Sequence, residues 1–392
     1  MLKLVKSAFY KERETRTALA RFIEQDHQLS YGPVCQEFEK EFAKWQGAKH
    51  AIMFSSGSTA NFALIQGLMH LGFLKKGDSV GFSAVTWPTN ILPLIQLGLK
   101  SIPIDVNLKT LNISPEILEN TLKKHKIKAL FLTHVLGFCD NMEKIVSICK
   151  NKKIILLEDT CEALGTTYKG KRLGSFGLGG TFSFFVGHHM STIEGGMIVT
   201  NDDNLARELK IIRSHGWDRH LAPHEQKYLR EKHGIDDFHA LYTFYNLGSN
   251  FRPTEISGFL GRHQLKYVDI IVSRRKRNFE KLSKAIHSRE DLYYPMDVEH
   301  IEVVSNFAFP IVARNKKIRD ISIKRAKGKV EIRPIIAGNI IRQPFYKISG
   351  GMNKKLDNAD IIHDNGLYLG NNPDLSSKDI KTLIKIFTDF AV

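Results

Sequence analysis

The first half of the chain alternates short, continuous apolar runs with segments whose apolar residues recur at helical spacing. Uninterrupted apolar runs of this length are typical of strands that are buried on both faces of a parallel sheet. We expect such strands at 79–82, 101–104, 129–132 and 154–157. We expect helices between them at about 60–71, 115–124 and 141–150. This alternation predicts an α/β fold with a mainly parallel sheet.

The pattern changes beyond residue 205. A helix is expected at 204–214, and residues 222–244 are polar and aromatic without clear periodicity. A long basic stretch from 254 to about 287 predicts one helix. Strands at 303–312 and 330–333 then alternate with helices at 318–326 and 378–390, which is typical of a smaller α+β domain. We therefore predict a large domain at 1–270, which includes the N-terminal segment, and a small C-terminal domain at 271–392.

The composition is that of an ordinary globular protein. Of 392 residues, 42% are hydrophobic and 25% are charged. No run approaches the roughly 18 apolar residues that a membrane-spanning helix needs. The first residues lack the long apolar core of a secretion signal. We therefore expect a cytoplasmic protein that does not cross a membrane.

The formal net charge of +16 leaves two classes of partner open. Nucleic acid is one and an anionic small substrate is the other. Two basic runs, 274–277 and 324–329, are also compatible with ordinary solvated surface. The four cysteines, Cys35, Cys139, Cys149 and Cys161, form no CxxC pair. We therefore expect neither a metal site nor a disulfide framework.

Two short segments carry candidate chemistry at predicted strand ends. Residues 55–61 place small hydroxyl residues and Gly57 at a helix N-terminus, where backbone N–H groups bind anions. A plain helix cap fits this segment equally well. Asp159 ends a predicted buried strand, which is where open parallel sheets bind ligands. An aspartate there could hold a pyridine nitrogen protonated, or it could cap the next helix.

A third segment, 181–202, runs from an apolar strand through His188 and His189 to a glycine turn and a second strand. Adjacent histidines could be a surface pair or metal ligands. No third ligand lies nearby in the sequence, so we expect no metal here.

Together these segments resemble the DegT-type sugar aminotransferases over about residues 5–390. That family has fold type I, in which enzymes depend on pyridoxal phosphate (PLP) or pyridoxamine phosphate (PMP). The resemblance implies a large domain with a mainly parallel mixed sheet and a smaller C-terminal α+β domain. It also assigns cofactor-binding roles to eight residues: Ser56, Gly57, Ser58 and Ser183 at the phosphate, Trp87 stacked on the ring, Asp159 at the pyridine nitrogen, Glu162 near the ring hydroxyl, and Asn250 at the neighbouring subunit's phosphate.

One position departs from the aminotransferase pattern. Family members that transaminate carry a lysine six residues before the glutamate of the E-G-G turn, and here that position is His188. An imidazole has no primary amine to bond covalently with PLP, but it can move a proton near neutral pH. This version is similar to the sugar 3-dehydratases of the family, in which His188 would be the catalytic base and His189 a supporting neighbour.

The resemblance therefore implies a dehydratase that removes the C3 hydroxyl of a nucleotide-linked 4-keto-6-deoxyhexose in deoxysugar (O-antigen) biosynthesis. PMP or PLP would be bound noncovalently, with glutamate as the amino donor. The CDP-linked type carries an iron–sulfur cluster on four clustered cysteines, which this chain lacks. The GDP-linked type is therefore favoured. Further segments match this type: 156–162, 174–178, 213–219 and 330–334.

The same matching makes His215, Arg219, Arg252 and Glu331 candidate contacts for the sugar or its phosphates. For His215 and Arg219 a structural hydrogen bond or a surface pair is equally compatible. Asn250 and Arg252 imply a homodimer with shared active sites, because they would serve the partner's site.

Two alternatives remain open. One is a nucleotide-sugar aminotransferase of the same family that tolerates histidine. The other is a degenerate PLP fold used as a regulatory DNA-binding protein, which the positive charge allows. No nucleic-acid-binding motif supports the second, so we expect no nucleic-acid partner.

Overall fold

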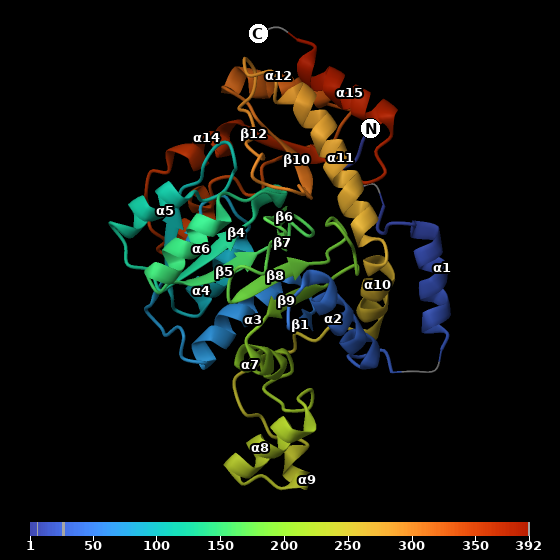
Figure 1. Cartoon of the computed structure of the whole chain (residues 1–392), viewed down its shortest axis with the longest axis vertical. Helices are drawn as coiled ribbons and strands as arrows, with labels where there is room; N and C mark the ends of the chain where they lie inside the picture. The colour runs from blue at the N-terminus through green and yellow to red at the C-terminus, as the bar shows by residue number, and fades with distance from the viewer. Residues whose placement is uncertain (6, 26–27, 391–392) are drawn as a thin grey trace.

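The computed structural model describes residues 1–5, 7–25 and 28–390. Its centre is a seven-stranded sheet in the order β1-β9-β8-β5-β4-β2-β3 (Figure 1). Strand β9 runs antiparallel to β1 and β8, and the other neighbours are parallel. The predicted mainly parallel mixed sheet is thus confirmed. The strands are β1 (His50–Phe54), β2 (Ser79–Ser83), β3 (Lys100–Ile104), β4 (Ala129–Thr133), β5 (Ile155–Asp159), β8 (Gly179–Ser183) and β9 (Gly196–Thr200).

The four strands expected from the apolar runs correspond to β2, β3, β4 and β5. Every residue of β4 is buried, because helices cover both faces of the sheet at its centre. The helices around the sheet are α2 (Pro33–Gln46), α3 (Gly57–His70), α4 (Leu92–Gln96), α5 (Pro115–Leu122), α6 (Met142–Asn151), α7 (Asp203–Arg213) and α10 (Glu255–Leu265). Helices α3 and α7 pack together, as do α2 and α10.

The C-terminal part contains a second, antiparallel sheet in the order β10-β12-β11. Its elements are β10 (Ala308–Val312), β11 (Ile332–Pro334), β12 (Gly366–Gly370), α11 (Val268–Ile286), α12 (Lys316–Ala326), α13 (Pro344–Ile348), α14 (Asp357–Asn365) and α15 (Ser377–Thr388). The N-terminal residues of the chain reach this part, since the Leu2 N–H donates to the Lys329 carbonyl at 2.7 Å. The proposed domain boundary at residue 270 falls in the first turn of α11 and stays a prediction.

The remaining elements are small or peripheral. Helix α1 (Glu12–Ile23) packs against α10. The others are the β6 and β7 hairpin (Thr167–Tyr168 and Lys171–Arg172) and the 3-10 turns η1 (Pro88–Asn90), η2 (Val135–Gly137) and η3 (Ile340–Arg342). None of the helices that the structure describes is both long enough and apolar enough to span a bilayer.

Two expectations from the pattern need correction. The single helix expected at 254–287 is two helices, Glu255–Leu265 and Val268–Ile286, separated by a turn at Lys266 and Tyr267. Helix α10 packs on α2, whereas α11 packs on α15, so the stretch serves two different layers. The strand expected at 303–312 begins only at Ala308.

Residues 222–244 form a lobe that projects from the sheet below α7 (Figure 1). It contains α8 (Pro223–His233) and α9 (Asp237–Ala240). Helix α8 has no buried residue, which explains why the sequence shows no helical periodicity there.

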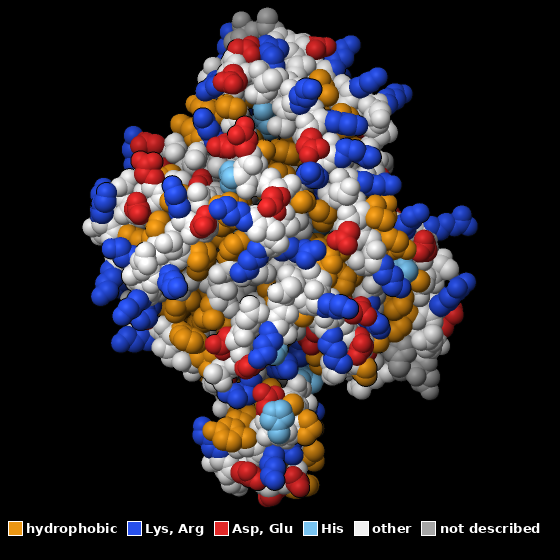
Figure 2. Space-filling model, in the orientation of Figure 1, with side chains coloured by type: hydrophobic (Ala, Val, Ile, Leu, Met, Phe, Trp, Pro, Cys, Tyr) orange, Lys and Arg blue, Asp and Glu red, His pale blue; other side chains and the backbone are white. Residues whose placement is uncertain are grey.

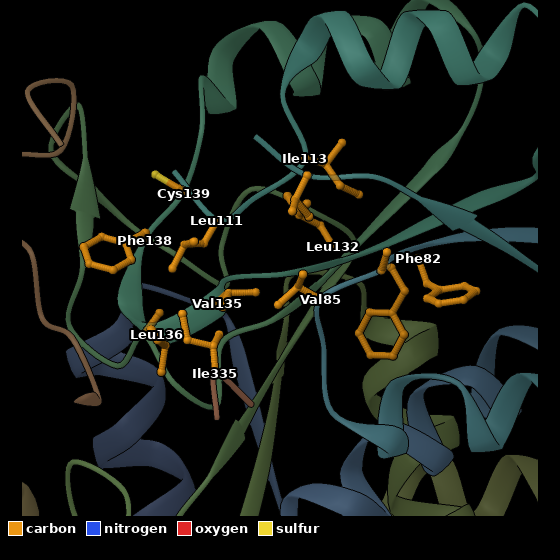
Figure 3. Close-up of a cluster of buried hydrophobic side chains, with 14 of the residues drawn as sticks. Phe82, Val85, Leu111, Ile113, Leu132, Val135, Leu136, Phe138, Cys139 and Ile335 are labelled. Carbon is orange, nitrogen blue, oxygen red and sulfur yellow. The ribbon is translucent and has the colours of Figure 1, made fainter. Parts of the chain in front are cut away.

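One continuous cluster of buried side chains joins the two sheets. Figure 3 shows part of it, in which Ile335 from the C-terminal part joins Val135 and Leu136 from the turn after β4. The two parts therefore share a core, and the cleft between them has rigid walls.

Candidate active site

A cavity of about 420 Å³ opens at the carboxyl ends of the parallel strands. The loops that follow β1, β2, β4, β5 and β8 all contribute to its wall, as expected for a ligand site in an open α/β sheet. The C-terminal part closes the cavity from the other side. The lining residues are Ser56, Gly57, Ser58, Thr86, Trp87, Thr89, Thr133, Val135, Asp159, Cys161, Glu162, Ser183, Phe185, His188, Glu194, Phe307, Ile336 and Tyr368.

Asp159 presents a buried carboxylate to this cavity from the end of β5. Its Oδ2 accepts from the side-chain amides of Asn90 at 2.8 Å and Asn61 at 3.1 Å. Its Oδ1 accepts from the backbone N–H of Cys161 at 2.9 Å. All three donors are neutral, and no cationic side chain of the described residues pairs with Asp159. A buried carboxylate of this kind is a fitting partner for a protonated ring nitrogen.

His188 reaches the cavity from the loop after β8. Its Nδ1 lies 2.7 Å from the carbonyl oxygen of Cys161. Because a carbonyl can only accept, Nδ1 carries the proton and Nε2 is left as the basic nitrogen. Burial lowers the pKa of His188 to about 4, although the Cys161 carbonyl and the Asp159 charge oppose this. The ring is therefore neutral near pH 7 and can accept a proton.

Two aromatic rings hold the His188 imidazole. The ring of Phe307 lies 5.0 Å away at 37°, and that of Phe185 lies edge-on at 6.3 Å. The neighbouring His189 faces a different direction, with its Nε2 2.9 Å from the carbonyl oxygen of Ser305. The paired histidines thus have separate environments, which a sequence pattern alone does not reveal.

Glu162 lies one turn beyond Asp159 and also lines the cavity. One of its carboxyl oxygens accepts from the backbone N–H of Leu136 at 2.8 Å. Burial raises the pKa of Glu162 to about 8; the Leu136 hydrogen bond opposes the shift and the Asp159 charge adds to it. Near pH 7 the side chain is therefore mainly a neutral carboxylic acid and can donate a hydrogen bond to a bound group.

The N-terminus of α3 also lines the cavity, through Ser56, Gly57 and Ser58. Ser56 caps the helix: its Oγ accepts from the Thr59 N–H at 3.1 Å, and its own N–H donates to Thr59 Oγ1 at 3.0 Å. A Cβ added at Gly57 would lie 2.8 Å from the Cβ of Ser183. Glycine thus allows the helix end and β8 to approach closely, which leaves the first N–H groups for an anion.

Trp87 provides an aromatic wall. Its side chain is 55% exposed, although it lines the cavity. The preceding Thr86 is anchored by a 2.7 Å hydrogen bond between its hydroxyl and that of Thr133. A large ring held at the mouth of a polar cavity is suited to stack on a planar ligand.

Some sequence-predicted residues do not line the cavity of this chain. Asn250 is exposed, and its Oδ1 accepts from Arg252 Nε at 2.9 Å. Glu331 accepts from the Leu4 N–H at 3.2 Å and from Arg333 at 2.6 Å. The roles assigned to Asn250, Arg252 and Glu331 stay predictions.

His215 and Arg219 lie at the base of the projecting lobe. The guanidinium of Arg219 sits 3.9 Å from the Trp217 ring centroid and donates to the Leu241 carbonyl at 2.6 Å. The His215 ring contacts Trp217 edge-on at 5.5 Å. Both residues thus have local structural contacts, and their substrate-binding roles stay predictions.

The structure also adds residues that the sequence analysis missed. Asn61 and Asn90 orient Asp159, and Phe307 and Tyr368 line the cavity from the C-terminal part. The sequence could have indicated Asn61, because this polar residue lies three positions before Leu64 and so falls on an apolar helix face. Phe307 and Tyr368 had none, because only tertiary folding brings them to the site.

Comparison with known proteins places this geometry in context. The sequence model of the DegT/DnrJ/EryC1/StrS aminotransferase family matches residues 10–388. A GDP-4-keto-6-deoxy-D-mannose 3-dehydratase from Yersinia pseudotuberculosis is 34% identical, over 97% of this chain and 96% of its own. One from Escherichia coli O55:H7 is 37% identical, over 88% and 89%. A crystal structure of GDP-4-keto-6-deoxymannose-3-dehydratase with a trapped PLP-glutamate geminal diamine superimposes with a TM-score of 0.89 and 31% identity, covering 99% of this chain and 100% of that one.

Proposed function

Because this chain belongs to the DegT/DnrJ/EryC1/StrS aminotransferase family, we propose that it is a PMP/PLP-dependent nucleotide-sugar 3-dehydratase. It removes the C3 hydroxyl of a nucleotide-linked 4-keto-6-deoxyhexose, with the GDP-4-keto-6-deoxymannose form favoured. The relatives at 34% and 37% identity that carry this name support the choice of substrate.

The observation that carries the proposal is the environment of His188. It occupies the position of the cofactor-binding lysine, and no lysine is among the described residues that line the cavity. Its Nδ1 is committed to the Cys161 carbonyl, so that Nε2 is free to act as a base. An enzyme with this residue can transfer protons but cannot capture the cofactor covalently.

The cavity fits the proposed cofactor at each of its ends. Asp159, which has only neutral donors around it, would hold the protonated pyridine nitrogen. The N-terminus of α3 at Ser56 and Gly57 would bind the phosphate, and Trp87 would stack on the ring. When bound, this cofactor supplies a pyridinium ring that accepts electron density while bonds break.

The side chains of this protein would then transfer the protons and hold the cofactor through hydrogen bonds. His188 would accept at Nε2 a proton from the cofactor carbon that carries the amino group, and would return it to the departing C3 hydroxyl, which leaves as water. Asp159 would pair with the ring nitrogen in its protonated form. Glu162, neutral near pH 7, would donate a hydrogen bond to the ring hydroxyl. Glutamate is the proposed amino donor that restores the amine form between turnovers.

The proposal includes a homodimer with shared active sites. Asn250 and Arg252 lie outside the cavity of their own chain, which suits residues that serve a partner. The projecting lobe and the chain just after it also expose a set of hydrophobic side chains (Figure 2): Tyr228, Phe238, Leu241, Tyr242 and Phe244 in the lobe, and Leu247 after it. Exposed apolar groups of this extent are typical of protein interfaces.

The proposal also includes a cytoplasmic location. All four cysteines are free thiols, which suits a reducing compartment.

A substrate panel tests the reaction. The protein is incubated with PMP, glutamate and GDP-, CDP-, UDP- or dTDP-linked 4-keto-6-deoxy sugars, and products are analysed by mass spectrometry. We expect loss of one hydroxyl and the greatest turnover with a GDP-linked sugar. Gain of an amine with the hydroxyl retained would identify an aminotransferase instead.

Borohydride reduction of the PLP-loaded protein is an independent test. We expect no lysine to become labelled, because none is among the described residues that line the cavity. The His188→Asn variant should lose at least about 100-fold of the dehydration rate. Stoichiometric labelling of a lysine, or full activity in His188→Asn, would contradict the proposal.

A further inference from the structure

Arg275, in α11, is a buried arginine that the proposed mechanism does not use. It is 4% exposed and lies behind the histidine pair, on the side away from the active-site cavity. A buried guanidinium needs polar partners that compensate for its lost hydration, because desolvating a charge costs free energy.

The hydrogen bonds of Arg275 converge on the segment that carries Phe307. Its Nη1 donates to the carbonyl oxygens of Asn371 at 2.7 Å, Phe307 at 2.9 Å and Asn306 at 3.4 Å. Asn371 returns a hydrogen bond from its amide to the Arg275 carbonyl at 3.0 Å. One side chain thus fixes the backbone on both sides of the Phe307 ring.

Phe307 links this arrangement to the catalytic base. Its ring lies 5.0 Å from the His188 ring and lines the active-site cavity. A shift of the 306–307 backbone would move the surface on which the imidazole rests. The hydrogen bonds of Arg275 therefore bear on the orientation of His188 Nε2.

Arg275 also places a positive charge near both histidines with little intervening solvent. The space between them is a cavity of only about 30 Å³, whose wall includes His188, His189 and Arg275. That is room for about one water molecule. The charge therefore acts through protein rather than through bulk water, and its effect is weakly screened.

We propose that Arg275 is a positioning residue for the dehydration, which holds the Phe307 ring against His188 and sets a buried positive charge behind the base. The inference rests on the proposed function for its catalytic consequence. The long side chain of arginine brings one charged nitrogen, Nη1, within hydrogen-bond distance of all three carbonyl oxygens.

The charges around His188 define what the Arg275 charge does. The titratable groups that line the two cavities beside His188 are Asp159, Cys161 and Glu162 from the end of β5 onward, His189 beside it, Glu194 before β9, Tyr10 before α1, Arg275 in α11, Tyr368 in β12 and Asp374 after β12. Asp159 raises the pKa of His188 and Arg275 lowers it, whereas burial lowers it most. Removing the Arg275 charge should therefore make His188 easier to protonate.

Two variants separate the charge from the geometry. Arg275→Gln removes the charge, and Arg275→Lys keeps it on a shorter side chain with a differently arranged set of N–H groups. Arg277→Gln is the matched control, because Arg277 is an exposed arginine two residues further along α11. Circular dichroism reports whether each variant is folded.

The first measurement is the ring ¹⁵N titration of His188 in the PMP-loaded protein, assigned by comparison with His188→Asn. In Arg275→Gln we expect the midpoint to rise by about one pH unit, with the acid limb of kcat/KM moving the same way. In Arg275→Lys we expect the midpoint to stay near the parent value, while kcat falls about tenfold and KM changes less than about twofold. Arg277→Gln should match the parent in every respect.

A folded Arg275→Gln with the parent midpoint and kcat would overturn the inference. If that variant does not fold, a folded Arg275→Lys with the parent kcat would overturn it. The titration needs no sugar substrate, so it still tests Arg275 if the substrate panel yields no dehydration. Failure of the proposed function and failure of this inference are thereby distinguished.

Discussion

At the scale of single residues, one backbone carbonyl decides what His188 can do. The hydrogen bond to Cys161 fixes the proton on Nδ1, so that Nε2 is a base from the start. Burial keeps the ring neutral, with a pKa of about 4. Glu162, only one turn from Asp159, has the opposite character and stays protonated near pH 7. Neighbouring acids and bases thus divide their roles through their surroundings.

Glu162 gives a prediction for the pH dependence of stability. Its pKa is raised to about 8 in the folded protein from 4.5. The folded state therefore binds more protons between these values, and this residue's contribution destabilises the protein as pH rises from about 5 to about 8. At pH 8.5 we expect the free energy of unfolding of Glu162→Gln to exceed that of the parent by up to about 2 kcal/mol. The gain stays this small because the half-buried side chain is partly screened by solvent.

Urea unfolding of the protein without cofactor, at pH 4 and at pH 8.5, checks this. Glu37→Gln is a suitable control, because Glu37 is an exposed carboxylate whose pKa is lowered by Lys40 rather than raised. A constant difference between Glu162→Gln and the parent at both pH values would contradict the expectation.

At the scale of elements, the active site is a set of strand ends. Several parallel strands deliver one part each, because they terminate at the same edge of the sheet. Strand β5 brings Asp159, β8 and the loop after it bring Ser183 and His188, and the helix after β1 brings the capped turn at Ser56 and Gly57. The contact between Gly57 and Ser183 shows how closely these elements must approach.

That contact predicts the result of Gly57→Ala. The new Cβ would lie 2.8 Å from Ser183 Cβ, so α3 must move away from β8 and its N–H groups must move with it. We expect the dissociation constant for PMP to rise at least about tenfold, measured by titration of cofactor fluorescence. Gly67→Ala, in the same helix but away from the cavity, should bind PMP as the parent does. If Gly57→Ala bound PMP as tightly as the parent, the cofactor phosphate would not bind at this turn.

At the scale of the whole molecule, the two sheets form the two walls of one site. Phe307, Ile336 and Tyr368 come from the C-terminal part and face the strand ends of the large sheet. The shared core behind them holds this cleft together. The projecting lobe (Figure 1) and Asn250 lie outside this cleft.

Complementation between two inactive variants tests the shared site. His188→Asn and Asn250→Ala are co-expressed with different affinity tags. If Asn250 serves the partner's phosphate, each mixed dimer regains one intact site, and a random mixture should recover about a quarter of the parent activity. If Asn250 acts within its own chain, mixing restores nothing. Light scattering on the same samples reports whether the particle is a dimer.

Much of this arrangement is encoded locally in the sequence. Continuous apolar runs marked β2 to β5, because strands buried on both faces need no alternation. The helix-capping turn at 55–59, the acid at the end of β5 and the histidine in place of a lysine were all visible as residue patterns. Each depends on neighbours within a few positions, which is the range over which a pattern carries information.

Only the tertiary structure decided the rest. The break at Lys266, the exposed lobe and the pairing of His188 with the Cys161 carbonyl depend on contacts between segments far apart in the chain. The same holds for Phe307 and Arg275, which packing places against and behind the histidines. The sequence alone determined which chemical groups were present and in what order. Folding determined their protonation and orientation, because burial and hydrogen bonding arise only when distant segments meet.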